Sequence, residues 1–452
     1  MPTSTNNNVT KRTLKVSESG RELYNFSQQY SVGGVNLLPV YFDSGKGSRL
    51  VDSAGNELID FICGFSATNL GQCHPIIVEA QVKSAQQITL ANIAGVSASW
   101  PRLAKRLCEK FGYDKVTAMT SGAEAADTAC KLARGWGIKT KKIDPAEVLV
   151  FGTSENYHGT ISGVWPLMEQ EAGWDLYGTF SGNVTNINPL TGKVLRYLHA
   201  EDYAEAFEQM HERVAGVIME PLHGTSRSME EEIEFCIQVR QLCKKYNILY
   251  IADEVRMGAC KTGKTLSSDW LGPENKPDMI VMGKSISGGA YPASFVLGSD
   301  EVLTNVKPYH SLSTIASTPM ACAVVEASLD IWETENLPQR ALNIHKQWKK
   351  EISSWSFPYL RYATAFGADM SLFLNEEYET REEKITARRL MLLCANKGLL
   401  VYPAPRGRVR LGTALTISNE DLLEGFRILR EALTELPLYG DIELDEQQRE
   451  GF

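Results

Sequence analysis

Two apolar stretches that each end at a charged residue constrain this chain more than any other feature. The first runs from Ile248 to Ala252 and ends at Asp253, and the second runs from Met279 to Gly283 and ends at Lys284. Short apolar stretches rich in β-branched residues are typical of buried parallel strands. Because the chemistry of open α/β sheets gathers beyond the carboxyl ends of the strands, we predict that Asp253 and Lys284 meet at one edge.

A lysine and a carboxylate at such an edge suit one cofactor. Lysine can hold pyridoxal phosphate as a Schiff base, and a carboxylate can keep the pyridine nitrogen of that cofactor protonated. The alternative is two ordinary strand ends whose charges are solvated. The motifs described below favour the cofactor, so we predict a pyridoxal-phosphate site.

Composition excludes several other classes of protein. The 452 residues exceed one typical domain and predict two or more packed units. A net charge of -9 argues against nucleic acid as a partner. No apolar stretch reaches the ~18 residues that cross a bilayer, and the polar residues 1–12 lack the apolar segment of a secretory signal. We therefore expect no membrane partner and a frayed N-terminal tail.

The cysteines and histidines give no sign of a metal or disulfide framework. The nine cysteines are scattered and none forms a CxxC pair, which suits a reducing cytosol and predicts a cytoplasmic location. The seven histidines lack the spacing of metal ligands, so we expect no metal.

The pattern of apolar stretches predicts an α/β fold with a smaller second domain. Helical and strand patterns alternate from about 80 to 330, which favours βαβ units and a mainly parallel sheet. Strands are predicted at 147–151, 214–220, 248–253, 278–282 and 294–297, and a hairpin at 51–61. The last third reads as α+β, with helices near 338–355 and 420–433 and strands at 369–374, 399–402 and 409–411. We predict an N-terminal segment over 1–80 that packs with the small domain, a large cofactor-binding domain over 81–330 and a small C-terminal domain over 331–452.

A third motif is a turn that enters a helix at Ser121 and Gly122. Glu124 and Asp127 fall in the first turn of that helix, where the helix dipole favours acids. A phosphate group could use the N–H groups at the same helix start. The alternative is a plain capped helix.

Taken together, these motifs resemble the class III, fold-type I pyridoxal-phosphate aminotransferases, particularly the ornithine aminotransferase branch. The resemblance covers about residues 30 to 435 and is dense in several blocks that follow the order of the family. These blocks are 71–75 (GQCHP), 121–134 (SGAEAADTACKLAR), 253–255 (DEV) and 283–292 (GKSISGGAYP). The family implies a large domain with a sheet of the seven-stranded type and a smaller C-terminal domain.

The resemblance implies a role for each matching residue. Lys284 would form the Schiff base and later move the substrate proton, and Asp253 would pair with the pyridine N–H. The other implied cofactor contacts are ring packing by Val255 and Tyr157, with His158 beside it, phosphate binding by Ser121, Gly122 and Ala123, an acid at Glu220, and Arg256 near the phenolic oxygen. Thr314 matches a threonine that reaches the phosphate of a neighbouring subunit, which implies a homodimer with shared active sites.

Arg410 matches the arginine that binds a substrate carboxylate, a role that suits the bidentate guanidinium. A surface salt bridge is the alternative for Arg410. Because Arg406 and Arg408 lie nearby, a register shifted by two residues also stays open.

The departures from the ornithine branch concern the substrate. Thr160 stands where that branch has an arginine, Thr225 where it has a glutamate, and Arg256 where it has a glutamine, while Val35 and Phe65 occupy aromatic substrate positions. A charged distal group would lose its partners in such a site, at a cost of about 1–3 kcal/mol for each group left unsatisfied. We therefore predict transfer between a hydrophobic or unusual amino acid, rather than ornithine, and a 2-oxo acid.

Other reactions stay open at this point. A racemase, epimerase or decarboxylase on the same scaffold would also use Lys284, and an ornithine aminotransferase remains an alternative if residues outside these motifs restore the ornithine contacts. A non-catalytic relative is the least favoured alternative, because Lys284 and Asp253 are both intact.

Overall fold

A computed structural model of the chain describes residues 18–32, 38, 40–91, 95–168, 182–307, 309–381 and 385–438. The chain forms two compact units. The small unit comprises Met1–Phe65, Gly71–Cys73 and Ile344–Phe452, and the large unit comprises Ser66–Leu70 and His74–Asn343. The domain boundaries predicted after residues 80 and 330 stay predictions.

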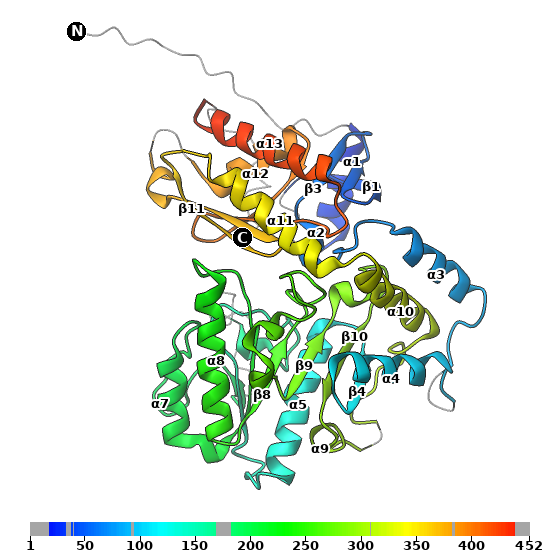
Figure 1. Cartoon of the computed structure of the whole chain (residues 1–452), viewed down its shortest axis with the longest axis vertical. Helices are drawn as coiled ribbons and strands as arrows, with labels where there is room; N and C mark the ends of the chain where they lie inside the picture. Colours follow the sequence, from blue (N-terminus) through cyan, green and yellow to red (C-terminus); the bar gives the residue numbers. More distant parts are fainter. Residues whose placement is uncertain are drawn as a thin grey trace. The chain divides into compact units, whose positions relative to one another are not determined.

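The large unit is built on a seven-stranded sheet (Figure 1). Its strands, in spatial order, are β4 (Lys115–Met119), β10 (Ser294–Gly298), β9 (Met279–Met282), β8 (Leu249–Asp253), β7 (Val214–Met219), β5 (Leu149–Phe151) and β6 (Val184–Thr185). The strands from β9 to β6 run parallel, whereas β10 is antiparallel to both β4 and β9. The predicted mainly parallel sheet is confirmed.

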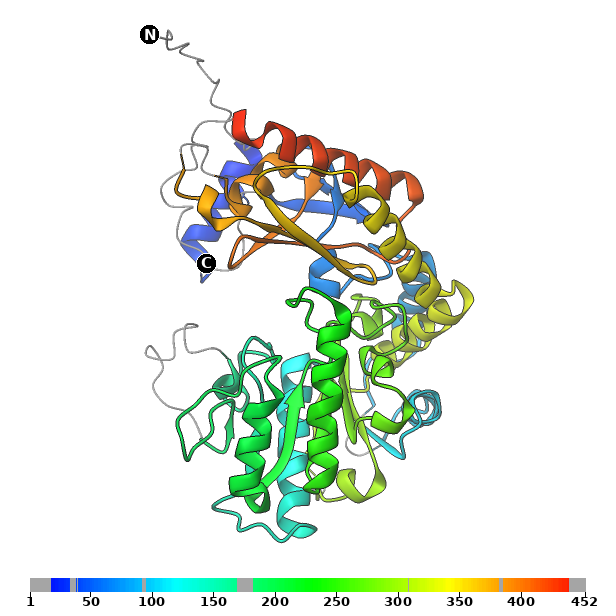
Figure 2. The same ribbon diagram turned by 60° about the vertical axis from the view of Figure 1, so that its left-hand side comes forward.

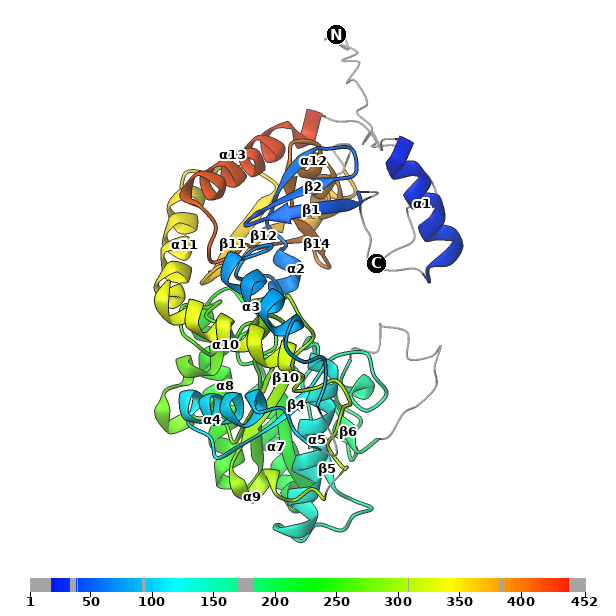
Figure 3. The same ribbon diagram turned by 90° about the vertical axis from the view of Figure 1, so that its right-hand side faces the viewer.

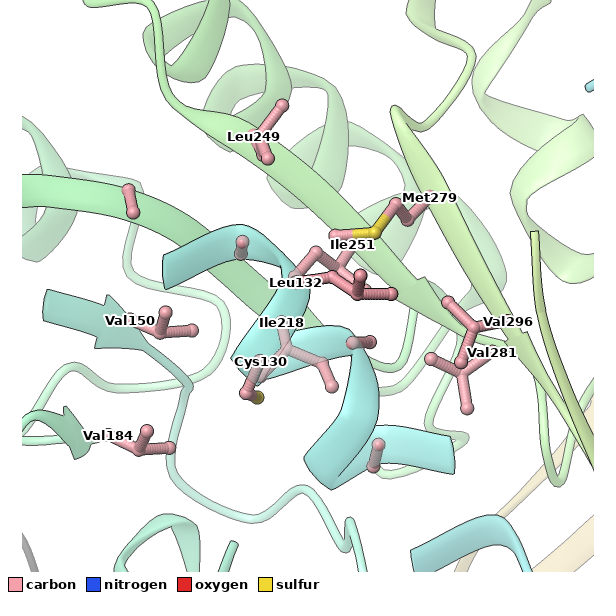
Figure 4. Packing of buried hydrophobic residues seen from close by; sticks show 14 of the residues in the cluster. Cys130, Leu132, Val150, Val184, Ile218, Leu249, Ile251, Met279, Val281 and Val296 are labelled. Carbon is pink, nitrogen blue, oxygen red and sulfur yellow. The ribbon is translucent and has the colours of Figure 1, made fainter. Parts of the chain in front are cut away.

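The central strands are buried on both faces because helices cover each side. Leu249 and Ile251 on β8 belong to the apolar cluster that also contains Leu132 of α5 (Gly122–Lys139), as Figure 4 shows. The intervening Tyr250 faces the opposite way, where the guanidinium of Arg240 on α8 (Met229–Lys245) lies 6.0 Å from its ring centre. Successive side chains of a strand point to opposite faces, so α5 and α8 cover different faces of the sheet.

The remaining helices of the large unit pack around this sheet. Helix α7 (Ala200–Met210) lies beside α8 (Figure 2), and α10 (Pro319–Thr334) lies against α3 (Pro75–Ala85) and α4 (Ser99–Phe111) (Figure 3). A one-turn helix, α9 (Asp300–Leu303), follows β10. Among the described helices, none combines the length and the apolar character needed to cross a bilayer.

The small unit contains two four-stranded sheets. One has the order β1 (Phe42–Lys46), β2 (Arg49–Asp52), β3 (Glu57–Asp60) and β13 (Leu399–Leu400), and the other the order β11 (Leu360–Phe366), β12 (Asp369–Leu374), β15 (Arg408–Gly412) and β14 (Tyr402–Ala404). Strands β2 and β3 are antiparallel, which confirms the predicted hairpin.

The helices of the small unit include both that were predicted. They are α11 (Leu337–Ile352), which begins in the large unit, and α13 (Asn419–Glu435); the others are α1 (Glu18–Tyr30), α2 (Cys63–Ser66) and α12 (Ala387–Asn396). Helix α12 packs against α13 and against β14.

Candidate active site

The parallel strands of the large unit deliver their polar residues to one edge. Asp253 is the last residue of β8, Glu220 follows β7, and Lys284 lies two residues beyond β9. These three strands are neighbours and parallel, so their carboxyl ends share an edge of the sheet. Strands β8 and β9 therefore lead to Asp253 and Lys284 at the same edge of the sheet, while the roles predicted for the two residues stay predictions.

A histidine orients the carboxylate of Asp253. The ring Nδ1 of His158 lies 2.7 Å from Oδ2 of Asp253, and both side chains are buried. Since an ionised carboxylate only accepts hydrogen bonds, Nδ1 of His158 must carry the hydrogen. Oδ1 of Asp253 accepts a second hydrogen bond, 3.0 Å long, from the N–H of Val255. The site therefore holds a buried carboxylate in a fixed orientation, as a cofactor with a ring N–H requires.

The side chain of Val255 joins three segments of the site. A Cβ placed on Gly122 would lie 2.8 Å from Cγ1 of Val255, and one placed on Gly283 would lie 3.4 Å from the same atom. Gly122 opens α5, and Gly283 precedes Lys284, so this valine packs where the acid, the lysine and the helix start come together.

Lys284 has a φ of 47°, a left-handed conformation that is uncommon outside glycine and clusters at functional sites.

Helix α5 begins as the sequence predicted. Ser121 is the N-cap residue, and its hydroxyl accepts the N–H of Glu124 while the Glu124 carboxylate accepts the N–H of Ser121. The N–H groups of Gly122 and Ala123 stand in the first turn, where an α-helix offers them no internal acceptor. These donors and the helix dipole suit a phosphate group.

The loop after β5 packs against this helix start through a glycine. Gly159 has a φ of 110°, and a Cβ on it would lie 2.3 Å from Cβ of Ala123. Only glycine permits both the conformation and the close approach. The loop thus carries Tyr157, whose side chain is 53% exposed, beside the candidate phosphate site.

Glu220 is the centre of a second buried group of charges. Its carboxylate accepts the N–H of Tyr157 at 3.0 Å, lies 3.0 Å from Nδ1 of His223, and lies 3.4 Å from Nε of Arg256. Burial alone would raise the pKa of Glu220, but His223, Arg256 and the Tyr157 N–H together hold that pKa far below its usual value. Arg256, predicted as a cofactor contact, is thus paired with an acid and also donates to the carbonyl of His223.

The candidate substrate residues of the small unit form a separate cluster. Tyr402 on β14 pairs in register with Arg410 on β15. The ring centres of Phe65 and Tyr402 are 4.7 Å apart, and the guanidinium of Arg410 lies 5.8 Å from the centre of Phe65. Arg408 is instead buried, and its Nε donates to Oγ of Ser371 at 3.0 Å. This arrangement favours Arg410 over Arg408 as a group that meets a ligand.

The other candidate residues are placed as follows. Thr160 and Thr314 are exposed, and Thr225 is half-buried, with no hydrogen-bond partner for its buried hydroxyl among the described residues. Val35 lies outside the described residues.

No group of three or more histidine, cysteine or acidic side chains suited to a metal occurs in the part of the chain that the structure describes.

Sequence reasoning missed three residues of these clusters. They are Asn156, whose side-chain oxygen accepts the N–H of Glu220 at 2.7 Å, Glu232, which binds the loop that carries Thr225, and Tyr402. Asn156 and Tyr402 each stand close to a residue that was predicted, and this proximity was the available signal. Glu232 ends an acidic run that is typical of a solvated helix face, so its burial could not be predicted from the sequence.

Comparisons with known proteins agree with this geometry. The family model described as Aminotransferase class-III matches residues 29–433. The chain is 34% identical to the ornithine aminotransferase of Schizosaccharomyces pombe, over 90% of this chain and 92% of that one. It is 32% identical to the ornithine aminotransferase of Emericella nidulans, over 93% and 92% of the two chains.

Solved structures give the same match. The ornithine aminotransferase of Toxoplasma gondii superposes with a TM-score of 0.83 at 26% identity, covering 94% of this chain and 96% of that one. The acetylornithine aminotransferase of Elizabethkingia anophelis superposes with a TM-score of 0.76 at 27% identity, covering 92% and 99%.

Proposed function

The chain belongs to the class III aminotransferases, and we propose that it moves the amino group of an amino acid with an uncharged side chain to a 2-oxo acid. The chain is a pyridoxal-phosphate-dependent enzyme of fold type I. The finer proposal, the class of amino donor, is argued from the residues in which this chain departs from the ornithine branch.

The residues of the large unit fit pyridoxal phosphate. The start of α5 would hold the phosphate group, the Asp253 carboxylate the pyridine N–H, and Lys284 the aldehyde carbon, with Val255 and Tyr157 against the ring. When bound, the cofactor supplies an electron sink for the amino-acid carbon that loses its proton. The packing of Val255 against both Gly122 and Gly283 is the observation that carries this assignment, because it joins the helix start, the acid and the lysine.

The chain's own residues then have distinct tasks. Nζ of Lys284 would move the proton at the donor Cα, as a general base and then a general acid. The N–H of His158 keeps the Asp253 carboxylate in one orientation. Arg410 would bind the carboxylate that donor and acceptor share, since its planar fork matches two carboxylate oxygens.

The donor is proposed from Thr160 and Thr225. These residues stand where the ornithine branch has an arginine and a glutamate, so these two positions offer no charged group that could pair with a charged distal end of a substrate. Within the small unit, Phe65 and Tyr402 place aromatic rings beside Arg410. The relatives named above are ornithine and acetylornithine aminotransferases, so ornithine is the reference donor for any test. Their names also support transfer over racemisation or decarboxylation.

The test is a panel of single amino acids, ornithine included, added to the purified enzyme without an oxo acid. Loss of the visible absorption band of the bound cofactor, faster with an uncharged amino acid than with ornithine, is the expected result. The inactive control is Lys284→Ala. If ornithine with 2-oxoglutarate is the best pair, the donor proposal fails while transfer stands. If the band persists while the amino acid loses optical activity or carbon dioxide, transfer itself fails.

We also propose a homodimer in which Thr314 reaches the cofactor phosphate of the neighbouring subunit. Exposed apolar side chains support a covered surface on the large unit: Ile76, Val78 and Val82 on α3, and Leu312 and Ile315 beside Thr314. Exposed apolar side chains that adjoin one another mark interaction surfaces on soluble proteins, whereas isolated ones are common. The cytoplasmic location is kept as a proposal and is supported by nine free cysteines, although the Arabidopsis thaliana relative is named as mitochondrial.

A further inference from the structure

The loop that joins β7 to α8 is held by a single buried carboxylate. Glu232, in the first turn of α8, is 0% exposed. Its Oε2 accepts the N–H groups of His223 at 2.5 Å and Gly224 at 3.0 Å, and its Oε1 accepts those of Thr225 and Ser226, each at 3.0 Å. A carboxylate offers about four lone-pair positions, so four consecutive backbone donors saturate this one.

The loop carries groups that belong to the candidate active site. The imidazole of His223 lies 3.0 Å from Oε1 of Glu220, and the backbone carbonyl of His223 accepts a hydrogen bond from Arg256. Glu220 in turn accepts the N–H of Tyr157, the proposed ring-stacking residue. A shift of the His223 backbone would therefore disturb the hydrogen bonds that His223 makes with Arg256 and with Glu220. Through Glu220 it would also disturb the hydrogen bond to the Tyr157 N–H.

The same loop places the proposed substrate residue Thr225. Its N–H is bound by Glu232, and its hydroxyl is buried without a partner among the described residues. A hydroxyl in that condition costs free energy unless a ligand or water completes it. Glu232 thus fixes the backbone of the loop that carries two groups. One is His223, which contacts Glu220 and Arg256, and the other is the Thr225 hydroxyl, which a substrate could use.

A carboxylate this deeply buried needs compensation, and two features supply it. The four N–H groups donate to a carboxylate, and such charge-assisted hydrogen bonds are shorter and stronger than those between neutral groups. The first turn of a 17-residue helix also favours an acid through the helix dipole. The neighbouring Glu231 provides a contrast, because it is exposed and accepts the N–H of Arg227 at 3.2 Å.

We propose that Glu232 is a positioning residue for the transfer reaction. By holding the backbone of residues 223–226, it would keep His223, Arg256 and Thr225 in one fixed arrangement around the amino donor. This inference rests on the roles proposed above for Tyr157 and Thr225. Glu232 would act through this loop, without contact to substrate or cofactor. Its effect should therefore appear in the Michaelis constant of the donor and in the surroundings of the cofactor, not in the identity of the reaction.

The test compares Glu232→Gln with Glu231→Gln as the matched control on the same helical turn. The amide keeps the size of the side chain but replaces one acceptor by an NH₂ group that faces backbone N–H donors. In the folded enzyme we expect the KM of the donor to rise about 10–100-fold with a smaller change in kcat, and the visible circular dichroism of the bound cofactor to change. Glu231→Gln should change neither.

A purely structural role predicts a different result. Glu232→Gln would then lower the melting temperature but leave the KM and the cofactor spectrum of the folded protein as in the wild type, and this outcome would overturn the proposal. If Glu232→Gln does not fold, the same measurements are made on Glu232→Asp, which keeps the charge but shortens the side chain. An unchanged donor KM in folded Glu232→Asp would equally contradict the proposal. If the wild type transfers no amino group at all, the proposed function has failed instead.

Discussion

At the scale of single residues, His158 holds the buried carboxylate of Asp253, which we propose pairs with the cofactor. We predict that His158→Phe lowers kcat/KM about 10–100-fold and weakens cofactor binding, because a hydrogen bond to a charged group contributes about 1.5–3 kcal/mol and its loss leaves a buried carboxylate half-paired. Steady-state kinetics and titration of the apoenzyme with pyridoxal phosphate measure both effects.

The matched control for that substitution is His199→Phe. His199 also faces a carboxylate, that of Glu201 at 2.6 Å, but its side chain is 43% exposed. Removal of an exposed pair should leave kinetics and cofactor binding unchanged. Wild-type cofactor affinity in His158→Phe would show that the orientation of Asp253 does not depend on this hydrogen bond.

The arginines of β15 should separate into a structural and a functional residue. We expect Arg408→Ala to lower the free energy of unfolding by about 1–3 kcal/mol, because the buried Ser371 hydroxyl loses its donor. We expect Arg410→Lys to leave stability nearly unchanged and to raise the donor KM at least tenfold, since an ammonium group cannot reproduce the bidentate fork. Urea unfolding and steady-state kinetics distinguish the two; the opposite assignment would mean that the register is shifted by two residues.

The sequence could predict the placement of Asp253 and Lys284 because the first ends an apolar strand and the second follows one closely, and the shared direction of the two strands then leads both to one edge. It could not predict the partners of Arg256 or the burial of Glu232. Those depend on the path of a loop with no periodicity, in which four backbone N–H groups turn toward one side chain. The carboxylate–imidazole pair of His158 was likewise invisible, because its two members stand 95 residues apart.

At the scale of elements, the approach of the loop after β5 to the start of α5 depends on Gly159. We predict that Gly159→Ala lowers the free energy of unfolding by about 1–3 kcal/mol and weakens cofactor binding, because the added methyl would overlap Ala123 and the φ of 110° disfavours alanine. Urea unfolding and cofactor titration test this. Gly182→Ala is the control, since a Cβ there meets no atom within 4 Å among the residues that the structure describes.

Element prediction succeeded where burial was strong and failed where strands are edges. The strands β7, β8 and β9 are buried along their whole length and were predicted within one residue of their observed ends. The edge strand β4 was missed because its sequence, KVTAM, begins with an exposed lysine and is only partly buried. The antiparallel direction of β10 also has no signature in its apolar residues, because direction is set by the connection and not by composition.

At the scale of the whole molecule, Glu220 makes the free energy of unfolding depend on pH in the acid range. The pKa of this buried carboxyl is lowered in the folded state, so its stabilising effect is complete above the ordinary value of about 4.5 and is lost as the pH falls below it. We predict that the difference in unfolding free energy between wild type and Glu220→Gln shrinks by on the order of 1 kcal/mol from pH 6 to pH 4. Urea unfolding at each pH measures it. Glu208→Gln, an exposed glutamate on α7, is the charge-matched control, and a difference that does not vary with pH would contradict the assignment.

The association of two chains is the property of the whole molecule on which the proposed site depends, because Thr314 would serve the neighbouring subunit. Val82 on α3 is 54% exposed, and a charge there would oppose burial in an interface. We predict that Val82→Glu shifts the mass measured by light scattering toward that of one 50.1 kDa chain and that cofactor is lost with it. Leu423→Glu on α13, at a side chain 45% exposed, should change neither. A wild type that is monomeric yet binds cofactor and transfers amino groups would show that one chain completes the site alone, and Thr314 would then have no role in trans.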